Sequence, residues 1–155
     1  MAQQLWLLRH GEAVPHDAQP EFDRRLTDRG RDQSRAAGHA LRALEVEVHL
    51  CVTSPKVRAR ETAELACAEL GIEPVDEESL AEGFDGRAAL ALMAAAGPDQ
   101  RVLAVGHEPD FSQVVYDLTG GRVDLKKGGI AAIRLDGLRG ELIVLLRPRE
   151  MDRIR

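Results

Sequence analysis

A chain of 155 residues with 44% hydrophobic and 30% charged side chains has the composition of an ordinary folded domain, which excludes a disordered or fibrous protein, and we expect a single domain over 1–155. Its formal net charge of -5 gives no general attraction for nucleic acid or an anionic membrane, so we expect neither as a partner. No apolar run is long enough to cross a membrane, and 1–8 leads too directly into a strand to be a secretory signal, which favours the cytoplasm.

The first half of the chain alternates strands and helices. An apolar run at 4–8 predicts a buried strand that stops at Arg9-His10-Gly11. Thr27 is expected to cap a helix that extends to about residue 43. A second strand is expected at 49–53, and Ser54-Pro55 has the pattern of a helix start, with a capping hydroxyl before a proline in the first helical position.

The second half continues the alternation and is expected to end in a turn between two strands. The helix from Pro55 is expected to end near Leu70. A short strand at 73–76 and a helix at 87–96 are expected next. They are followed by a strand at 101–106, a helix from Pro109 to 118, and a hairpin of 130–135 with 142–146. The strand at 101–106 is apolar almost throughout, which indicates burial on both faces of a largely parallel sheet. The sequence therefore predicts an α/β fold, a three-layer α/β/α sandwich with an antiparallel edge hairpin, and the segment 147–155 is expected to be a solvated end.

Polar residues follow three of the predicted strands. Arg9, His10 and Gly11 come after the first strand, Arg58 follows the second, and His107 follows the strand at 101–106. Ligands in open α/β sheets bind outside the carboxyl ends of the strands, so these segments are expected to meet in one crevice.

The residues expected in this crevice are suited to phosphoryl transfer. Guanidinium groups and imidazoles can match the charge on the three peripheral oxygens of a phosphoryl group, which is the role expected of Arg9, Arg58 and His107. A neutral imidazole can attack phosphorus, and His10 is the better candidate because it is flanked by Arg9 and by Gly11, whose amide is expected to approach the phosphate. Metal ligation is the weaker interpretation, because adjacent arginines repel a cation, and no cofactor is expected.

These residues resemble the histidine phosphatase superfamily, whose hallmark is Arg-His-Gly after the first strand. Within it the chain looks like the small SixA-type phosphohistidine phosphatases, with a phosphoglycerate mutase-like fold. The resemblance also rests on Arg-Arg-Leu-Thr-Asp-Arg-Gly at 24–30, Ser-Pro-Lys-Val-Arg-Ala-Arg-Glu-Thr at 54–62, Gly-His-Glu-Pro at 106–109 and Gly-Ile-Ala-Ala-Ile at 129–133. A tripeptide alone is a weak signal, whereas several blocks in the family's order are a strong one.

The resemblance implies a role for each matching residue. It makes His10 the phosphorylated nucleophile and Arg9, Arg58 and His107 ligands of the phosphate. Arg24 stands where such proteins often have an arginine, and is expected to reach the phosphate or the edge of the substrate. Relatives that cleave esters have an acidic residue in the region where this chain has Glu82, which is therefore the candidate general acid.

Three functions remain open on the sequence. The first is a metal-independent phosphatase for phosphohistidine on another protein, since an imidazole leaves without a general acid and the short chain has little length for a lid. The second is a phosphomonoesterase for small phosphorylated metabolites, with Glu82 as acid. The third is a phosphate-binding adaptor without turnover. Lys126 and Lys127 could form an electropositive rim for an acidic partner, although a solvated loop is the commoner role for such a pair.

Overall fold

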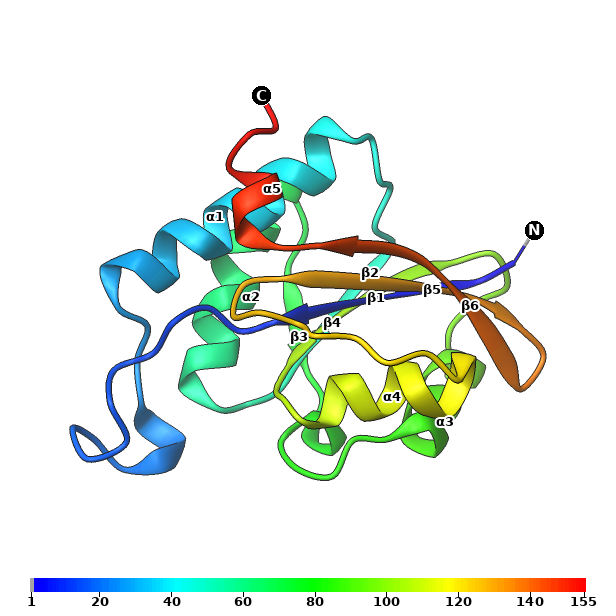
Figure 1. Ribbon diagram of the computed structural model, residues 1–155, viewed down its shortest axis with the longest axis horizontal. Helices are drawn as coiled ribbons and strands as arrows, with labels where there is room; N and C mark the ends of the chain where they lie inside the picture. Colours follow the sequence, from blue (N-terminus) through cyan, green and yellow to red (C-terminus); the bar gives the residue numbers. More distant parts are fainter. Residues whose placement is uncertain (1) are drawn as a thin grey trace.

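A mixed sheet lies between two layers of helices in the computed structural model, which describes residues 2–155 (Figure 1). The six strands are β1 (Gln4–Arg9), β2 (Leu50–Thr53), β3 (Pro74–Asp76), β4 (Arg101–Gly106), β5 (Ile130–Asp136) and β6 (Arg139–Leu146). Their order in the sheet is β3-β2-β4-β1-β5-β6; the first four are parallel, and β5 and β6 run antiparallel to their neighbours. The predicted α/β sandwich with an antiparallel edge hairpin is thus confirmed.

The helices divide between the two faces of this sheet. They are α1 (Asp28–Ala43), α2 (Val57–Leu70), α3 (Gly86–Ala95), α4 (Asp110–Thr119) and α5 (Pro148–Met151), with single 3₁₀ turns η1 (Glu21–Asp23) and η2 (Glu78–Leu80). Figure 1 shows α1, α2 and α5 on one side of the sheet and α3 and α4 on the other. No helix within 2–155 is long and apolar enough to cross a membrane.

Side chains that alternate along the central strands build a core on each face. In β1, Leu5 and Leu7 pack in the cluster beneath α3 and α4, while Trp6 and Leu8 pack in the cluster beneath α1 and α2. Successive side chains of a strand point to opposite faces, so a continuous apolar run is what a doubly covered strand requires. The strand β4 follows the same rule, as its sequence predicted.

Pairing of the central strands brings the predicted site residues together. Arg9 in β1 is opposite Gly106 in β4, so the segments that begin with His10 and His107 leave the sheet side by side. The strand β2 flanks β4 on its other side, and the amide of Ser54 donates to the carbonyl of Val105 at 2.9 Å. All three segments therefore emerge at the same edge of the sheet.

Two predicted boundaries and one predicted tail were wrong. The helix α2 begins at Val57 rather than at Pro55, and its N-cap residue is Lys56, so Ser54 is not the cap. The helix α4 begins after Pro109 rather than with it. The segment 147–155 is not merely a solvated end, because it contains α5, whose Met151 is 1% exposed within the core cluster on the α1 side. A helix of four residues is too short to produce a recognisable apolar period.

Candidate active site

Side chains from three strand ends form a buried cationic and imidazole cluster. His10, Arg58 and His107 are 7%, 5% and 7% exposed, although polar side chains of this kind are rarely buried without a partner. The rings of His10 and His107 lie 5.2 Å apart between centroids, and the amide of His10 donates to the carbonyl of Gly106 at 3.0 Å. His10, Arg58 and His107 thus lie close together, as the sequence predicted.

The contacts of His10 determine which of its ring nitrogens carries the hydrogen. Its Nδ1 lies 2.7 Å from the carbonyl oxygen of Gly11, which can only accept a hydrogen bond. Its Nε2 lies 3.3 Å from Nε of Arg58, which can only donate one. His10 is therefore protonated on Nδ1, and Nε2 carries the lone pair.

Both buried imidazoles are neutral near pH 7. Burial is the largest cause that lowers the pKa of His10 to about 3; the hydrogen bond to Gly11 opposes it, and the charges of Arg58 and Arg9 add to it. Burial and the neighbouring His10 and Arg58 lower the pKa of His107 to about 3 as well. A neutral imidazole at His10 keeps its lone pair available for attack at phosphorus.

Arg58 lies at the second position of α2 and is held by the loop that precedes α1. Its Nη2 forms an ion pair of 2.7 Å with the carboxylate of Glu21, and its Nη1 donates to the carbonyl of the same residue at 2.8 Å. Although burial raises it, a hydrogen bond from Arg24 and the charge of Arg58 lower the pKa of Glu21 to about 2. Glu21 is therefore ionised at neutral pH and is unsuited to be a proton donor.

Two buried nitrogens beside His10 are left without a hydrogen-bond partner. Among the buried side-chain nitrogens and oxygens of residues 2–155, only Nε of Arg9 and Nδ1 of His107 have none. The other contacts of these residues are present: Arg9 donates from Nη1 to the carbonyl of Leu125 at 3.0 Å, and Nε2 of His107 lies 2.8 Å from Oγ of Ser54. An unpaired buried polar group costs roughly 1–3 kcal/mol, and both of these belong to residues beside His10.

Gly11 joins the His10 loop to α2 and packs against the start of α1. Its amide donates to Oγ1 of Thr62 at 3.1 Å, and the expected approach of this amide to a phosphate stays a prediction. The glycine is needed for packing, because a Cβ at this position would lie 2.5 Å from the carbonyl oxygen of Gly30 at the start of α1. Thr62 in turn donates to the carbonyl of Arg58 at 2.8 Å, which links the His10 loop to α2.

Arg24 is buried beside the cluster, with its guanidinium turned to its own loop. It donates from Nε to the carbonyl of Val14 at 3.0 Å and from Nη1 to Glu21 at 3.1 Å. Its charge still contributes to the lowered pKa of His10. The structure therefore places Arg24 within electrostatic range of His10 and shows it bound to Glu21.

Glu82 lines a cavity of about 240 Å³ together with Arg58 and His107. Its side chain is 85% exposed and lies 3.5 Å from Nζ of Lys56. Glu82, the predicted general acid, thus lines the same cavity as the predicted phosphate ligands Arg58 and His107, but its side chain is largely in solvent.

A metal site does not emerge from the residues that the structure describes. No group of three or more His, Cys, Asp or Glu side chains in that part of the chain is placed to hold a metal ion. Cys51 and Cys67 are free, buried thiols in the core. The arginines around His10 and His107 would oppose a cation at the cluster.

Comparison with known proteins gives the class of protein that this fold and site define. Residues 5–88 match the histidine phosphatase superfamily (branch 1), so the chain belongs to that superfamily, as its motifs predicted. The chain is a phosphatase of the hydrolase class with the phosphoglycerate mutase-like fold and a SixA-type organisation.

Particular relatives cover nearly all of the chain. Phosphohistidine phosphatase SixA of Escherichia coli is 31% identical over 86% of this chain and 86% of its own. The structure of the protein histidine phosphatase SixA complexed with tungstate aligns with a TM-score of 0.86 at 27% identity, covering 96% of this chain and 99% of that one. An uncharacterised protein of Picosynechococcus sp. is 34% identical over 94% of this chain and 97% of its own.

Three residues that hold the site escaped the sequence analysis. Ser54 and Thr62 lie within a motif that was recognised, yet their partners, His107 and Gly11, are far away in the chain. Glu21 lies in a polar loop with no motif of its own. Only the folded structure brings Glu21 to Arg58, so no sequence pattern could have found it.

Proposed function

We propose that the protein is a metal-independent protein phosphohistidine phosphatase in which His10 is the nucleophile and Arg9, Arg58 and His107 bind the transferred phosphoryl group. One observation carries the proposal: two buried nitrogens beside His10, Nε of Arg9 and Nδ1 of His107, have no partner among residues 2–155, while Nε2 of His10 keeps its lone pair. Nε of Arg9 would donate to an oxygen of a phosphoryl group, and so would Nδ1 of His107 in the tautomer in which Ser54 donates to Nε2 of that ring.

The reaction proceeds in two displacements. The lone pair of His10 Nε2 forms a bond to phosphorus while the bond between phosphorus and the substrate nitrogen breaks, and its electron pair returns to the leaving imidazole. Water then attacks the phosphorylated His10, the bond between phosphorus and Nε2 breaks, and the proton of water leaves with phosphate. The carbonyl of Gly11 accepts from Nδ1–H throughout and keeps the ring oriented.

The substrate class follows from the leaving group. An imidazole of pKa about 6.5 departs as a neutral ring when its other nitrogen is protonated, whereas an alkoxide needs a proton from a general acid. In this site Glu21 is ionised and Glu82 is largely solvated and paired with Lys56. The similarity to proteins named phosphohistidine phosphatase supports the same choice. We further propose that the enzyme works in the cytoplasm and without a cofactor.

A phosphomonoesterase for small metabolites is the second candidate. It is favoured by the place of Glu82 in the cavity that Arg58 and His107 also line, where a carboxyl group could protonate a leaving alkoxide. A third candidate, a phosphate-binding adaptor, would use the same donors without turnover.

The test is phosphate release from a phosphohistidine protein and from phenyl phosphate, measured with chelator present. The proposal requires release in chelator and a larger kcat/KM for the phosphohistidine substrate. A larger kcat/KM for the ester would favour the metabolite phosphatase, and tight phosphate binding without release from either substrate would favour the adaptor. Loss of activity in chelator would contradict the metal-independent mechanism.

A further inference from the structure

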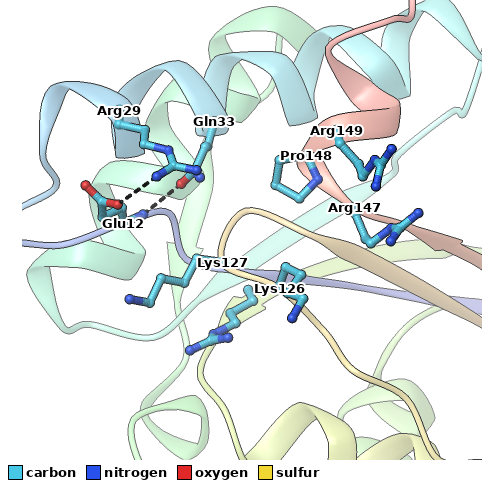
Figure 2. A pocket seen from close by; sticks show the side chains of 9 residues that line it. Glu12, Arg29, Gln33, Lys126, Lys127, Arg147, Pro148 and Arg149 are labelled. Atoms are coloured by element: carbon cyan, nitrogen blue, oxygen red, sulfur yellow. Dashed lines mark hydrogen bonds and ion pairs between the residues drawn. The ribbon is translucent and has the colours of Figure 1, made fainter.

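A second cavity, of about 560 Å³, lies next to the cluster and is lined by cations. Figure 2 shows side chains from α1, from the segment before β5 and from the C-terminal segment gathered around it. We call it the basic pocket and define it by six cationic residues: Arg9, Arg29, Lys126, Lys127, Arg147 and Arg149. Its lining includes one acidic residue, Glu12, which pairs with Arg29 at 3.5 Å.

The basic pocket is physically joined to the proposed catalytic residues. Arg9 belongs to both, since it lines the basic pocket and precedes His10. The segment that carries Lys126 and Lys127 is also fixed to this strand end, because the amide of Gly128 donates to the carbonyls of Arg9 and His10 at 3.0 and 3.1 Å. A ligand held in the pocket therefore lies at a defined position relative to the nucleophile.

The exposure of these cations favours an extended partner over a small anion. The side chains of Lys126, Arg147 and Arg149 are 56%, 48% and 71% exposed, and each has an acidic neighbour. Exposed ion pairs contribute about 0.2–1 kcal/mol each, so a small ligand that meets two or three of them gains little. A surface with several acidic groups meets many at once and is also steered toward them during association.

The negative charge of the rest of the chain helps to orient an acidic partner as it approaches. The chain as a whole carries a formal net charge of -5, while six cations and one carboxylate line this pocket. An acidic partner is repelled by most of the molecule and attracted at this face, so it approaches with its own surface beside His10. Lys127 has no ion-pair partner among residues 2–155 and is free to receive a carboxylate.

We propose that the basic pocket docks an acidic surface patch of a phosphoprotein substrate, next to the phosphohistidine that enters the cluster. This inference rests on the proposed function and names the surface chemistry of its partner. The arginines of the C-terminal segment thereby gain a role in substrate recognition.

The experiment compares two synthetic peptides, each with one phosphohistidine, flanked either by Asp and Glu or by Asn and Gln. The measured quantity is the ratio of kcat/KM for the acidic peptide to that for the neutral one. At low ionic strength we expect a ratio of about ten in the wild type, which falls toward one in 0.5 M salt, roughly as charge screening requires. The double variant Lys127→Glu/Arg149→Glu is expected to bring the ratio to one or below at low salt.

A matched double variant controls for net charge. Arg87→Glu/Arg139→Glu makes the same change in total charge at exposed positions in α3 and at the start of β6, outside the basic pocket. It is expected to keep most of the preference. An equal loss in both double variants, or a wild type that hydrolyses both peptides equally well, would overturn the inference and leave the proposed function intact.

A binding measurement separates docking from catalysis. Fluorescence anisotropy with the same two peptides, without the phosphoryl group, is expected to show tighter binding of the acidic peptide, lost in Lys127→Glu/Arg149→Glu. If this holds while neither phosphopeptide is hydrolysed, the docking surface stands and the proposed function fails. If inorganic tripolyphosphate binds the pocket more tightly than the acidic peptide, the site is one for small polyanions and the inference is wrong.

Discussion

Nε of Arg58 lies 3.3 Å from Nε2 of His10 and donates to the lone pair of that nitrogen, since the other ring nitrogen, Nδ1, carries the hydrogen. The arginine thus orients the ring of His10, the proposed nucleophile. In the proposed mechanism the same N–H turns to a phosphoryl oxygen when phosphorus approaches Nε2, so one donor orients the ring first and stabilises the transition state afterwards.

This double role makes Arg58 sensitive to conservative replacement. Arg58→Lys keeps the charge but loses the planar fork that reaches His10 and Glu21 together, and we expect kcat to fall by about 10²-fold or more. Arg60→Lys, in the same helix, is the matched control, because Arg60 pairs with Glu64 and Asp76 at the surface. Steady-state kinetics of both variants, with folding checked by circular dichroism, would contradict this role if the two lost activity equally.

Stability is expected to fall in mild acid because of the two buried imidazoles. The folded-state pKa of His10 and of His107 is about 3, below the unfolded value of about 6.5, so the unfolded chain binds more protons between these values. Their neutral forms favour folding fully above pH 6.5, and this contribution is lost as the pH falls toward 3, on the order of a few kcal/mol for each. Urea unfolding at pH 7 and pH 4.5 measures the change.

A variant isolates these two residues from the carboxylates that also titrate in acid. His10→Gln/His107→Gln is expected to lose less free energy of unfolding between the two pH values than the wild type. An equal loss in both proteins would show that the imidazoles do not determine the acid sensitivity.

Glu82 distinguishes ester chemistry from phosphoramidate chemistry. For the proposed phosphohistidine phosphatase, Glu82→Gln changes phosphohistidine hydrolysis by less than about threefold, because imidazole leaves without a general acid. Hydrolysis of phenyl phosphate falls by about 10²-fold or more if Glu82 donates a proton to the leaving oxygen. Glu78→Gln, at another exposed position nearby in the chain, is the control. A large fall for both substrates would contradict the proposed substrate class.

Ser54 is expected to act through His107. Its hydroxyl lies 2.8 Å from Nε2 of His107, so Ser54→Ala removes the contact that orients this ring, and we expect kcat to fall by about tenfold with a smaller change in KM. Ser34→Ala removes another fully buried hydroxyl, in α1, and controls for loss of stability. A positioning role also predicts a shifted pH profile for Ser54→Ala; a lower unfolding temperature with unchanged kinetics would refute it.

The sequence predicted the sheet and the centre of the site, because both depend on local patterns. The apolar runs at 4–8 and 101–106 mark doubly covered strands, and parallel strands put Arg9, His10 and His107 at one edge. The single-domain organisation and the catalytic roles stay predictions. Contacts between distant segments, such as the ion pair of Glu21 with Arg58, could not be predicted because they depend on the folded chain. The helix that contains Met151 has four residues, too few for a recognisable apolar period in the sequence.

In the proposed mechanism, Nε2 of His10 carries the phosphoryl group between the two steps. The direct measurement is to mix wild type and His10→Ala with a radiolabelled phosphohistidine protein, quench at alkaline pH within the first turnover, and map the label by mass spectrometry and phosphorus NMR. We expect one phosphoryl group per wild-type molecule, on Nε2 of His10, and neither label nor turnover in the variant. Turnover by His10→Ala, or a wild-type phosphoenzyme labelled on another residue, would contradict it.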